Sequence, residues 1–120
     1  MMYENNLVAS EMAHKLMHDV YHPLTACLFF DEDGRIFDLY LFDTFYCQPA
    51  FPVKVRAHQC MLISHHFDGS IHPYQEDLQS IEALKKVYPD TICSLMMYSE
   101  YNGLLQIEET YYTDEHKYAR

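Results

Sequence analysis

The sequence predicts a single α/β domain in which helices flank a mixed central sheet. Hydrophobic residues make up 49% and charged residues 22% of the 120 residues, which is typical of one globular domain. Stretches with helical spacing alternate with apolar runs, in the order helix, hairpin, strand, helix and hairpin. Elements in this order are expected to pack as helices against a sheet.

The first half of the chain predicts a helix followed by a hairpin. A helix is expected over 6–20, because apolar side chains recur every four residues at Val8, Met12, Leu16 and Val20. It ends before Pro23, since the residue that precedes a proline avoids helical geometry. The continuous apolar run at 24–30 predicts a buried strand. The Asp-Glu-Asp-Gly turn at 31–34 joins it to a second strand over 35–42.

The middle of the chain is less regular. Residues 43–52 carry two prolines and are expected to form a loop. The stretch 53–58 alternates apolar and basic side chains, so a strand and a short helix both remain open for it. The apolar run 60–64 predicts a short buried strand that leads directly into His65 and His66.

The second half repeats the pattern of helix and hairpin. Pro73 suits the first turn of a helix that runs to about Tyr88. Its apolar face consists of Leu78, Ile81, Leu84 and Tyr88. A strand is expected over 91–97, and Asn102-Gly103 is a hairpin signal before a last strand over 104–109.

The excess of acidic over basic residues indicates which classes of binding partner to expect. Eight Lys and Arg against eighteen Asp and Glu give a net charge of −10. Because phosphate binding needs a basic surface, nucleic acids and anionic membranes are not expected partners. The sign suits a protein partner with a basic surface, or mimicry of a nucleic acid, and it equally suits plain solubility.

The chain is expected to divide into a domain over 1–110 and a polar, tyrosine-rich tail over 111–120. No apolar run approaches the roughly 18 residues of a membrane helix, and the first residues lack the pattern of a signal peptide. A cytoplasmic protein is therefore expected. Tyrosine is favoured at interfaces, so the tail residues Tyr111, Tyr112 and Tyr118 are candidates for a protein-binding surface, and a homo-oligomer remains open.

The cysteines indicate free thiols rather than a zinc ribbon. They are scattered without a Cys-x-x-Cys pair, at Cys27, Cys47, Cys60 and Cys93. Three of them lie in strongly apolar surroundings, so buried free thiols are expected. Structural zinc sites space their ligands in close pairs, which this chain does not do with cysteine.

The chemistry-bearing residues concentrate in the segment 64–77. Its three histidines and three acids are His65, His66, His72, Asp68, Glu76 and Asp77. Neutral imidazole and carboxylate are ordinary zinc ligands, so this segment is a candidate metal site between a buried strand and a helix. The alternative is a solvated loop in which the histidines are incidental, because the chain is rich in histidine throughout.

The spacing within this segment suggests a family. His66 is followed by seven residues, Tyr74, two residues and Asp77, and Pro23-Leu24-Thr25-Ala26-Cys27 stands upstream. This resembles the JAB/MPN (JAMM) metallopeptidase family, whose members carry a glutamate, often within Pro-x-Glu-x-Cys, and then His-x-His, seven residues, Ser, two residues and Asp. The resemblance covers about residues 7–109 and implies a JAB/MPN-like, cytidine-deaminase-like domain.

Three of the five chemical positions depart from the family's pattern. The family's glutamate acts as general base on the zinc-bound water, and Thr25 at its position cannot accept the proton. Ser64, a poor zinc ligand, stands at the first histidine, and Tyr74 stands at the serine that helps to stabilise the oxyanion. Only His66 and Asp77 match the family's zinc ligands, so no residue is assigned a catalytic role.

A neighbouring histidine is a candidate for the missing ligand. On an extended strand His65 points away from the face that holds His66, unless a bulge re-aims it. His72 lies in the loop before the helix, so His66, His72 and Asp77 form the best route to a retained zinc. His22 is a remote candidate for the missing base.

Two functions follow from the resemblance. The favoured one is a non-catalytic MPN-like module that binds or inhibits another protein and has no tightly bound zinc, as family members without the metal motif act as scaffolds. The alternative is a divergent zinc-dependent hydrolase of peptide or isopeptide bonds that uses the rebuilt set His66, His72 and Asp77. A third interpretation keeps only the fold class, as a small α/β ligand-binding protein without kinship to the family.

Overall fold

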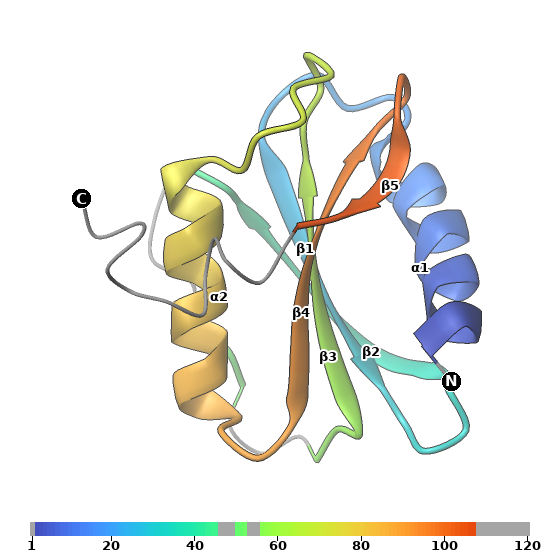
Figure 1. The fold of residues 1–120 in the computed structure, drawn as a ribbon, viewed down its shortest axis with the longest axis vertical. Helices are drawn as coiled ribbons and strands as arrows, with labels where there is room; N and C mark the ends of the chain where they lie inside the picture. Colours follow the sequence, from blue (N-terminus) through green and yellow to red (C-terminus); the bar gives the residue numbers. More distant parts are fainter. Residues whose placement is uncertain (1, 46–49, 53–55, 108–120) are drawn as a thin grey trace.

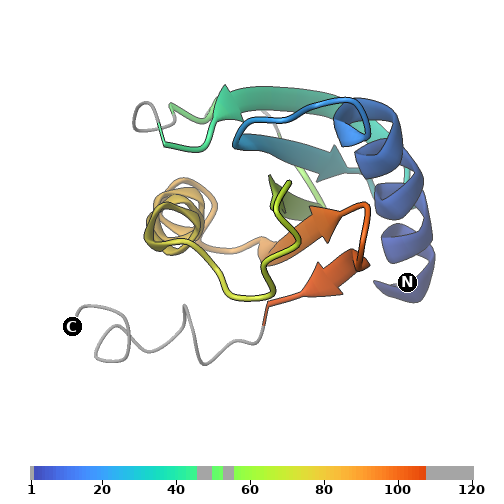
Figure 2. The same ribbon diagram turned by 90° about the horizontal axis from the view of Figure 1, so that it is seen from above.

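A computed structural model describes residues 2–45, 50–52 and 56–107. Within these ranges, five strands form one sheet, and the two helices cover its opposite faces (Figure 1). The view from above shows the same three layers, with α2 and α1 on opposite sides of the sheet (Figure 2). In chain order the elements are α1 (Met2–Met17), β1 (Leu24–Phe30), β2 (Ile36–Asp43), β3 (Gln59–His65), α2 (Gln75–Val87), β4 (Ile92–Ser99) and β5 (Gly103–Gln106).

The sheet is mixed, as the sequence predicts. Its strand order is β2-β1-β3-β4-β5. Strand β1 runs antiparallel to both β2 and β3, whereas β3 and β4 are parallel and α2 connects them. Strand β5 then returns antiparallel to β4. The expected class, an α/β domain with helices on a mixed sheet, is confirmed.

Side chains of the central strands alternate between two hydrophobic cores. On β3, Cys60 and Leu62 pack on the α2 side, and Met61 and Ile63 pack on the α1 side. This alternation is what the two-residue period of a strand requires. Because a helix covers each face, the central strands are apolar on both sides and read in the sequence as continuous runs.

Both predicted hairpins are present. In the first, Asp31 Oδ1 accepts the backbone N–H groups of Asp33 and Arg35, and Gly34 takes a positive φ of 78° that suits glycine. In the second, Ser99 pairs with Gly103, which has φ 68°. A short loop with glycine in this conformation is a common hairpin connection.

The bounds of both helices differ from those predicted. Helix α1 covers Met2–Met17 instead of 6–20, so it begins and ends earlier along the chain. The residues after it form a turn, in which the Val20 N–H donates to the Met17 carbonyl. Helix α2 starts at Gln75 with Tyr74 as its N-cap, so Pro73 lies just outside the helix. At the start of α2 the Tyr74 N–H donates to Asp77 Oδ2, a local capping bond that favours a helix start at Gln75.

Several predictions concern residues that the structure describes only in part. Residues 56–58 lie in neither a helix nor a strand, and residues 53–55 lie outside the described ranges. Cys47, the end of the predicted strand 104–109 and the tail 111–120 also lie outside the described ranges. Within the described ranges no helix is long and apolar enough to cross a membrane.

Candidate functional site

His66 and Asp77, the two residues that match the family's zinc ligands, are hydrogen-bonded to each other. His66 follows β3, and Asp77 lies in the first turn of α2. Their Nε2 and Oδ2 atoms are 2.9 Å apart, and both side chains are 0% exposed. The pair therefore links the end of β3 to the start of α2, at the top of Figure 1.

The partners of the His66 ring determine where its protons lie. Nδ1 is 3.0 Å from the Ser70 carbonyl oxygen, which can only accept, so Nδ1 carries a proton. Nε2 faces Asp77 Oδ2, which also accepts the Tyr74 N–H at 2.8 Å. A further proton must lie between Nε2 and Oδ2 for these two atoms to be hydrogen-bonded. This hydrogen bond engages Nε2, which is the ring nitrogen that would have to bind a zinc ion.

Tyr74 covers the His66 ring. The two rings stack with centroids 4.1 Å apart and planes inclined by 21°, and the Phe45 ring lies 5.0 Å from Tyr74. Burial and the Asp68 and Asp77 carboxylates raise the pKa of Tyr74 to about 12, so its hydroxyl stays neutral at physiological pH. At the family's serine position, a neutral aromatic ring thus closes over the imidazole.

Thr25 and Ser64 are direct neighbours across β1 and β3. Both side chains are buried, and strand alternation puts them on the α2 face together with Cys27 and Leu62. The Thr25 hydroxyl is hydrogen-bonded to the Thr44 hydroxyl at 2.6 Å. Thr25 and Ser64, which the resemblance aligns with the family's glutamate and first histidine, are therefore adjacent, and both are short neutral side chains.

Among the residues that the structure describes, two buried oxygens of this site have no hydrogen-bond partner, namely Ser64 Oγ and Asp77 Oδ1. Leaving a buried polar group without a hydrogen bond lowers the free energy of unfolding by about 1–3 kcal/mol. A polar ligand that bonds to either oxygen would recover this free energy. The space bordered by His66, Ser70 and Met97 is too narrow for a water molecule. In the part of the chain that the structure describes, no three His, Cys, Asp or Glu side chains are arranged to hold a metal ion.

His65 lies on the opposite face of the sheet from His66. Its Nδ1–H donates to the His22 carbonyl at 3.3 Å, and its ring lies 6.3 Å from that of Tyr98. Burial lowers the pKa of His65, because the charged form loses its hydration. The alternation of side chains along an extended strand, rather than a bulge, sets this orientation.

His72 and His22 have exposed side chains. The His72 N–H donates to the Ser70 hydroxyl at 3.3 Å, and the His22 Nδ1–H donates to the Pro23 carbonyl at 3.3 Å. Among the described residues, the structure thus brings together His66 and Asp77 and adds neither of these histidines to them.

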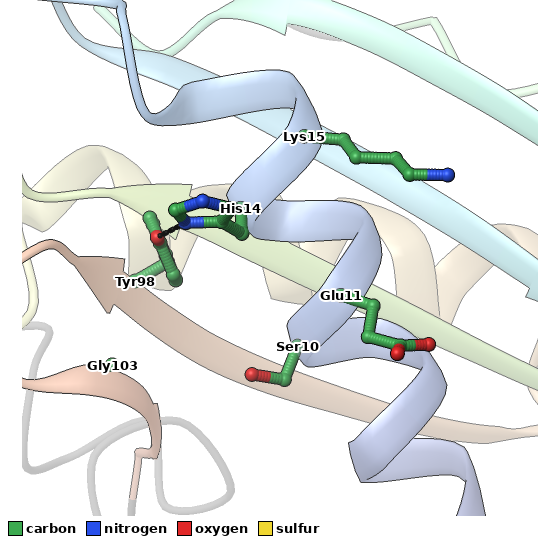
Figure 3. A pocket seen from close by; sticks show the side chains of 6 residues that line it. All are labelled: Ser10, Glu11, His14, Lys15, Tyr98 and Gly103. Atoms are coloured by element: carbon green, nitrogen blue, oxygen red, sulfur yellow. Dashed lines mark hydrogen bonds between the residues drawn. The ribbon is translucent and has the colours of Figure 1, made fainter.

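A second hollow, between α1 and the β4–β5 hairpin, was not anticipated from the sequence. It has a volume of about 520 Å³ and is lined by Ser10, Glu11, His14, Lys15, Tyr98 and Gly103. His14 Nδ1 is hydrogen-bonded to the Tyr98 hydroxyl at 2.9 Å (Figure 3). Burial and Glu100 raise the pKa of Tyr98. These residues are far apart in the chain, and His14 does not belong to the apolar face predicted for the first helix, so no local pattern indicated this contact.

Fold and site define a three-layer α/β domain with a buried His–Asp pair at the junction of a strand and a helix. No family model, curated protein or solved structure gives a match to this chain.

Proposed function

We propose that this chain is a non-catalytic, MPN-like domain that acts by binding another protein. The main support for this proposal is the hydrogen bond between His66 and Asp77, which lies beneath the Tyr74 ring. The two residues that match zinc ligands hold a proton between them, and they are closed off from solvent.

The kinship to the JAB/MPN family is supported by where its five chemical positions lie. Thr25 is opposite Ser64, His66 is bonded to Asp77, and Tyr74 stacks on His66. Residues far apart in the sequence thus converge at one end of the sheet. The family's spacing requires this convergence, because its glutamate, ligands and serine act on one zinc-bound water.

The lack of catalysis is supported by the chemistry of the same residues. A general base must accept a proton from water, and the Thr25 hydroxyl is instead engaged by Thr44. Loss of a base typically removes about 10²–10⁴ of the rate, and Ser64 supplies no imidazole for the metal. Tyr74 also fills the space over His66 that a substrate carbonyl needs.

Protein binding is supported by the edge of the sheet. Among the described strands, β2 has only β1 as a neighbour, and it exposes Phe37, Leu39 and Leu41. An edge strand presents unpaired backbone N–H and C=O groups, and a partner can add a strand to it. Burial of the exposed apolar side chains against the partner would then contribute to the binding free energy, in addition to the main-chain hydrogen bonds.

Elemental analysis of the untagged chain tests this proposal. We expect far less than one zinc per chain, no isopeptide hydrolysis, and thermal stability that a chelator leaves unchanged. His66→Ala is the diagnostic variant, and His72→Ala, which changes an exposed histidine, is its matched control. Stoichiometric zinc that is lost in His66→Ala but kept in His72→Ala would overturn the non-catalytic proposal.

The alternative is a divergent zinc-dependent hydrolase, and one observation favours it. Among the described residues, Ser64 Oγ and Asp77 Oδ1 are buried oxygens without hydrogen-bond partners, and oxygen atoms of this kind can bind a cation. Zinc would have to displace the proton between His66 and Asp77, so its affinity would fall steeply as the pH decreases. Zinc content is therefore measured at pH 6 and pH 8. A higher zinc content at pH 8 indicates that zinc displaces the proton, and a low content at both pH values indicates a site that does not bind zinc.

A further inference from the structure

Two cysteines face each other across the parallel pair of strands at the centre of the sheet. Cys60 of β3 is directly opposite Cys93 of β4. Both lie on the α2 side, where Cys60 belongs to the buried core and Cys93 packs against it. Paired residues of neighbouring strands lie about 4.7–4.9 Å apart. This separation falls within the roughly 4.4–6.8 Å between the Cα atoms of a disulfide.

The two thiols are neighbours and are not equivalent. The Cys93 thiol donates to the Thr91 carbonyl at 3.5 Å. The interaction between the two thiols lowers the pKa of Cys93, with a further contribution from the positive charge of Lys85, and raises that of Cys60. Cys93 is also partly exposed, whereas Cys60 is fully buried. Cys93 can therefore meet a small oxidant, and Cys60 is positioned to react next.

We propose that Cys60 and Cys93 are a site of oxidative modification, at which hydrogen peroxide converts the thiol pair into a disulfide between β3 and β4. The proposal does not depend on kinship with the JAB/MPN family. It gives the buried thiols a role that lies outside the His66–Asp77 site.

The reaction proceeds in two balanced steps. The Cys93 thiol loses its proton and the thiolate attacks one peroxide oxygen, so an S–O bond forms, the O–O bond breaks, and the departing hydroxide takes up that proton to become the first water. The Cys60 sulfur then attacks the sulfenic sulfur, so the S–S bond forms and the S–O bond breaks. The departing hydroxide takes the Cys60 proton and leaves as water. In total, two thiols and one hydrogen peroxide give one disulfide and two waters.

The disulfide would close the segment between Cys60 and Cys93, which contains α2 and the His66–Asp77 pair. A cross-link of this kind restricts the unfolded chain, so we expect the oxidised form to melt at a higher temperature than the reduced form. Because Cys93 is partly exposed, dithiothreitol should reverse the change.

Peptide mapping of the peroxide-treated chain tests the proposal. The untagged, reduced chain is exposed to hydrogen peroxide under native conditions, alkylated and digested for mass spectrometry. We expect a linked peptide pair that contains Cys60 and Cys93, and a protein mass lower by about 2 Da for the two hydrogens lost. Cys60→Ser should accumulate a dimedone-reactive sulfenic acid at Cys93, and Cys93→Ser should leave Cys60 reduced.

Cys27→Ala is the matched control, because Cys27 is a buried thiol on the same face whose neighbour in β3 is Leu62. It should form the disulfide as the natural chain does. A linkage of Cys60 or Cys93 to Cys27 or Cys47 would overturn the proposal. Oxidation of Cys93 that leaves Cys60 as a free thiol, or a thiol content that peroxide does not change, would overturn it as well.

Discussion

Asp77 joins the end of β3 to the start of α2 through a single oxygen. Its buried Oδ2 accepts the Tyr74 N–H at 2.8 Å and meets Nε2 of His66 at 2.9 Å. Asp77→Ala removes both contacts and leaves the His66 ring buried without its partner. We expect the free energy of unfolding, measured in urea at neutral pH, to fall by about 3–5 kcal/mol, as when one side of a buried ion pair is removed.

Glu76 supplies the matched control for this substitution. It is also acidic and also lies in the first turn of α2, so it has the same favourable interaction with the helix dipole. Glu76→Ala should therefore lower the free energy of unfolding by less than about 1 kcal/mol. Similar losses in the two variants would contradict the structural role assigned to the bond between His66 and Asp77.

His65 predicts how stability depends on pH. Burial lowers its pKa in the folded state below the value of 6.5 expected in the unfolded chain. As the pH falls through 6.5, the unfolded state takes up a proton that the native state does not, so stability decreases until the folded pKa is reached. Above that range His65 is neutral in both states. His65→Leu should therefore flatten the dependence of the urea midpoint between about pH 5 and pH 7.

The exposed His72 serves as the control for the titration. His72→Gln also removes one histidine, but from a position in contact with solvent, so the slope of the urea midpoint against pH should remain that of the natural chain. If His65→Leu and the natural chain lose stability equally on acidification, the neutral, buried state of His65 is not the cause.

At the scale of the elements, most of the fold follows from local patterns. Strand β1 is buried on both faces and reads as the unbroken apolar run LTACLFF. Helix α2 buries Leu78, Ile81 and Leu84, whose spacing is visible in the sequence. The turns with Gly34 and Gly103 need a positive φ, which glycine adopts readily. Each of these signals lies within one element and needs no knowledge of its neighbours.

Contacts between elements depend on the register in which neighbouring strands pair. The local sequence pattern of one element does not specify this register. Spacing singled out His66 and Asp77, but it does not decide whether they hold a metal or each other. In the structure the two side chains are hydrogen-bonded to each other beneath the Tyr74 ring, and this arrangement depends on how α2 meets β3. The pairing of Cys60 with Cys93 likewise needs the parallel register of β3 and β4.

The register between β1 and β3 gives a direct test of the resemblance to the JAB/MPN family. Ser64 shares the face of His66, and Tyr74 closes the site above it. Ser64→His combined with Tyr74→Ser restores two of the family's positions and removes the covering ring. We expect this double variant to retain about one zinc per chain after dialysis, where the natural chain retains far less.

Ser64→Asn combined with Tyr74→Ser is the control, because it opens the site in the same way without adding an imidazole. Circular dichroism and thermal melting establish that both double variants are folded. A folded Ser64→His, Tyr74→Ser chain that retains no more zinc than this control would contradict the alignment of Ser64 with the family's first zinc histidine.

At the scale of the whole molecule, the two edges of the sheet differ. Strand β5 has four residues, whereas β2 has eight and exposes Phe37, Leu39 and Leu41. Helix α1 lies over β1, β4 and β5, so the leucines of β2 remain uncovered on that face. An irregularity opposite Phe29 and Phe30 interrupts only the start of β2. No other described strand pairs with the rest of this edge, and an edge strand of this kind can pair with an added strand.

A second copy of the chain can fill this edge. When two copies of β2 pair antiparallel about a two-fold axis through Tyr40, Leu39 of each copy lies opposite Leu41 of the other. Each copy carries a net charge of −10, so the copies repel one another and salt should strengthen the dimer by screening. We expect sedimentation equilibrium to show a dimer whose dissociation constant falls as salt rises.

Leu39→Lys should raise the dissociation constant of this dimer about tenfold or more. Leu7→Lys, which changes an exposed leucine of α1, should leave it unchanged. A chain that stays monomeric at about 0.5 M salt, or a dimer that Leu39→Lys does not weaken, would contradict pairing through β2.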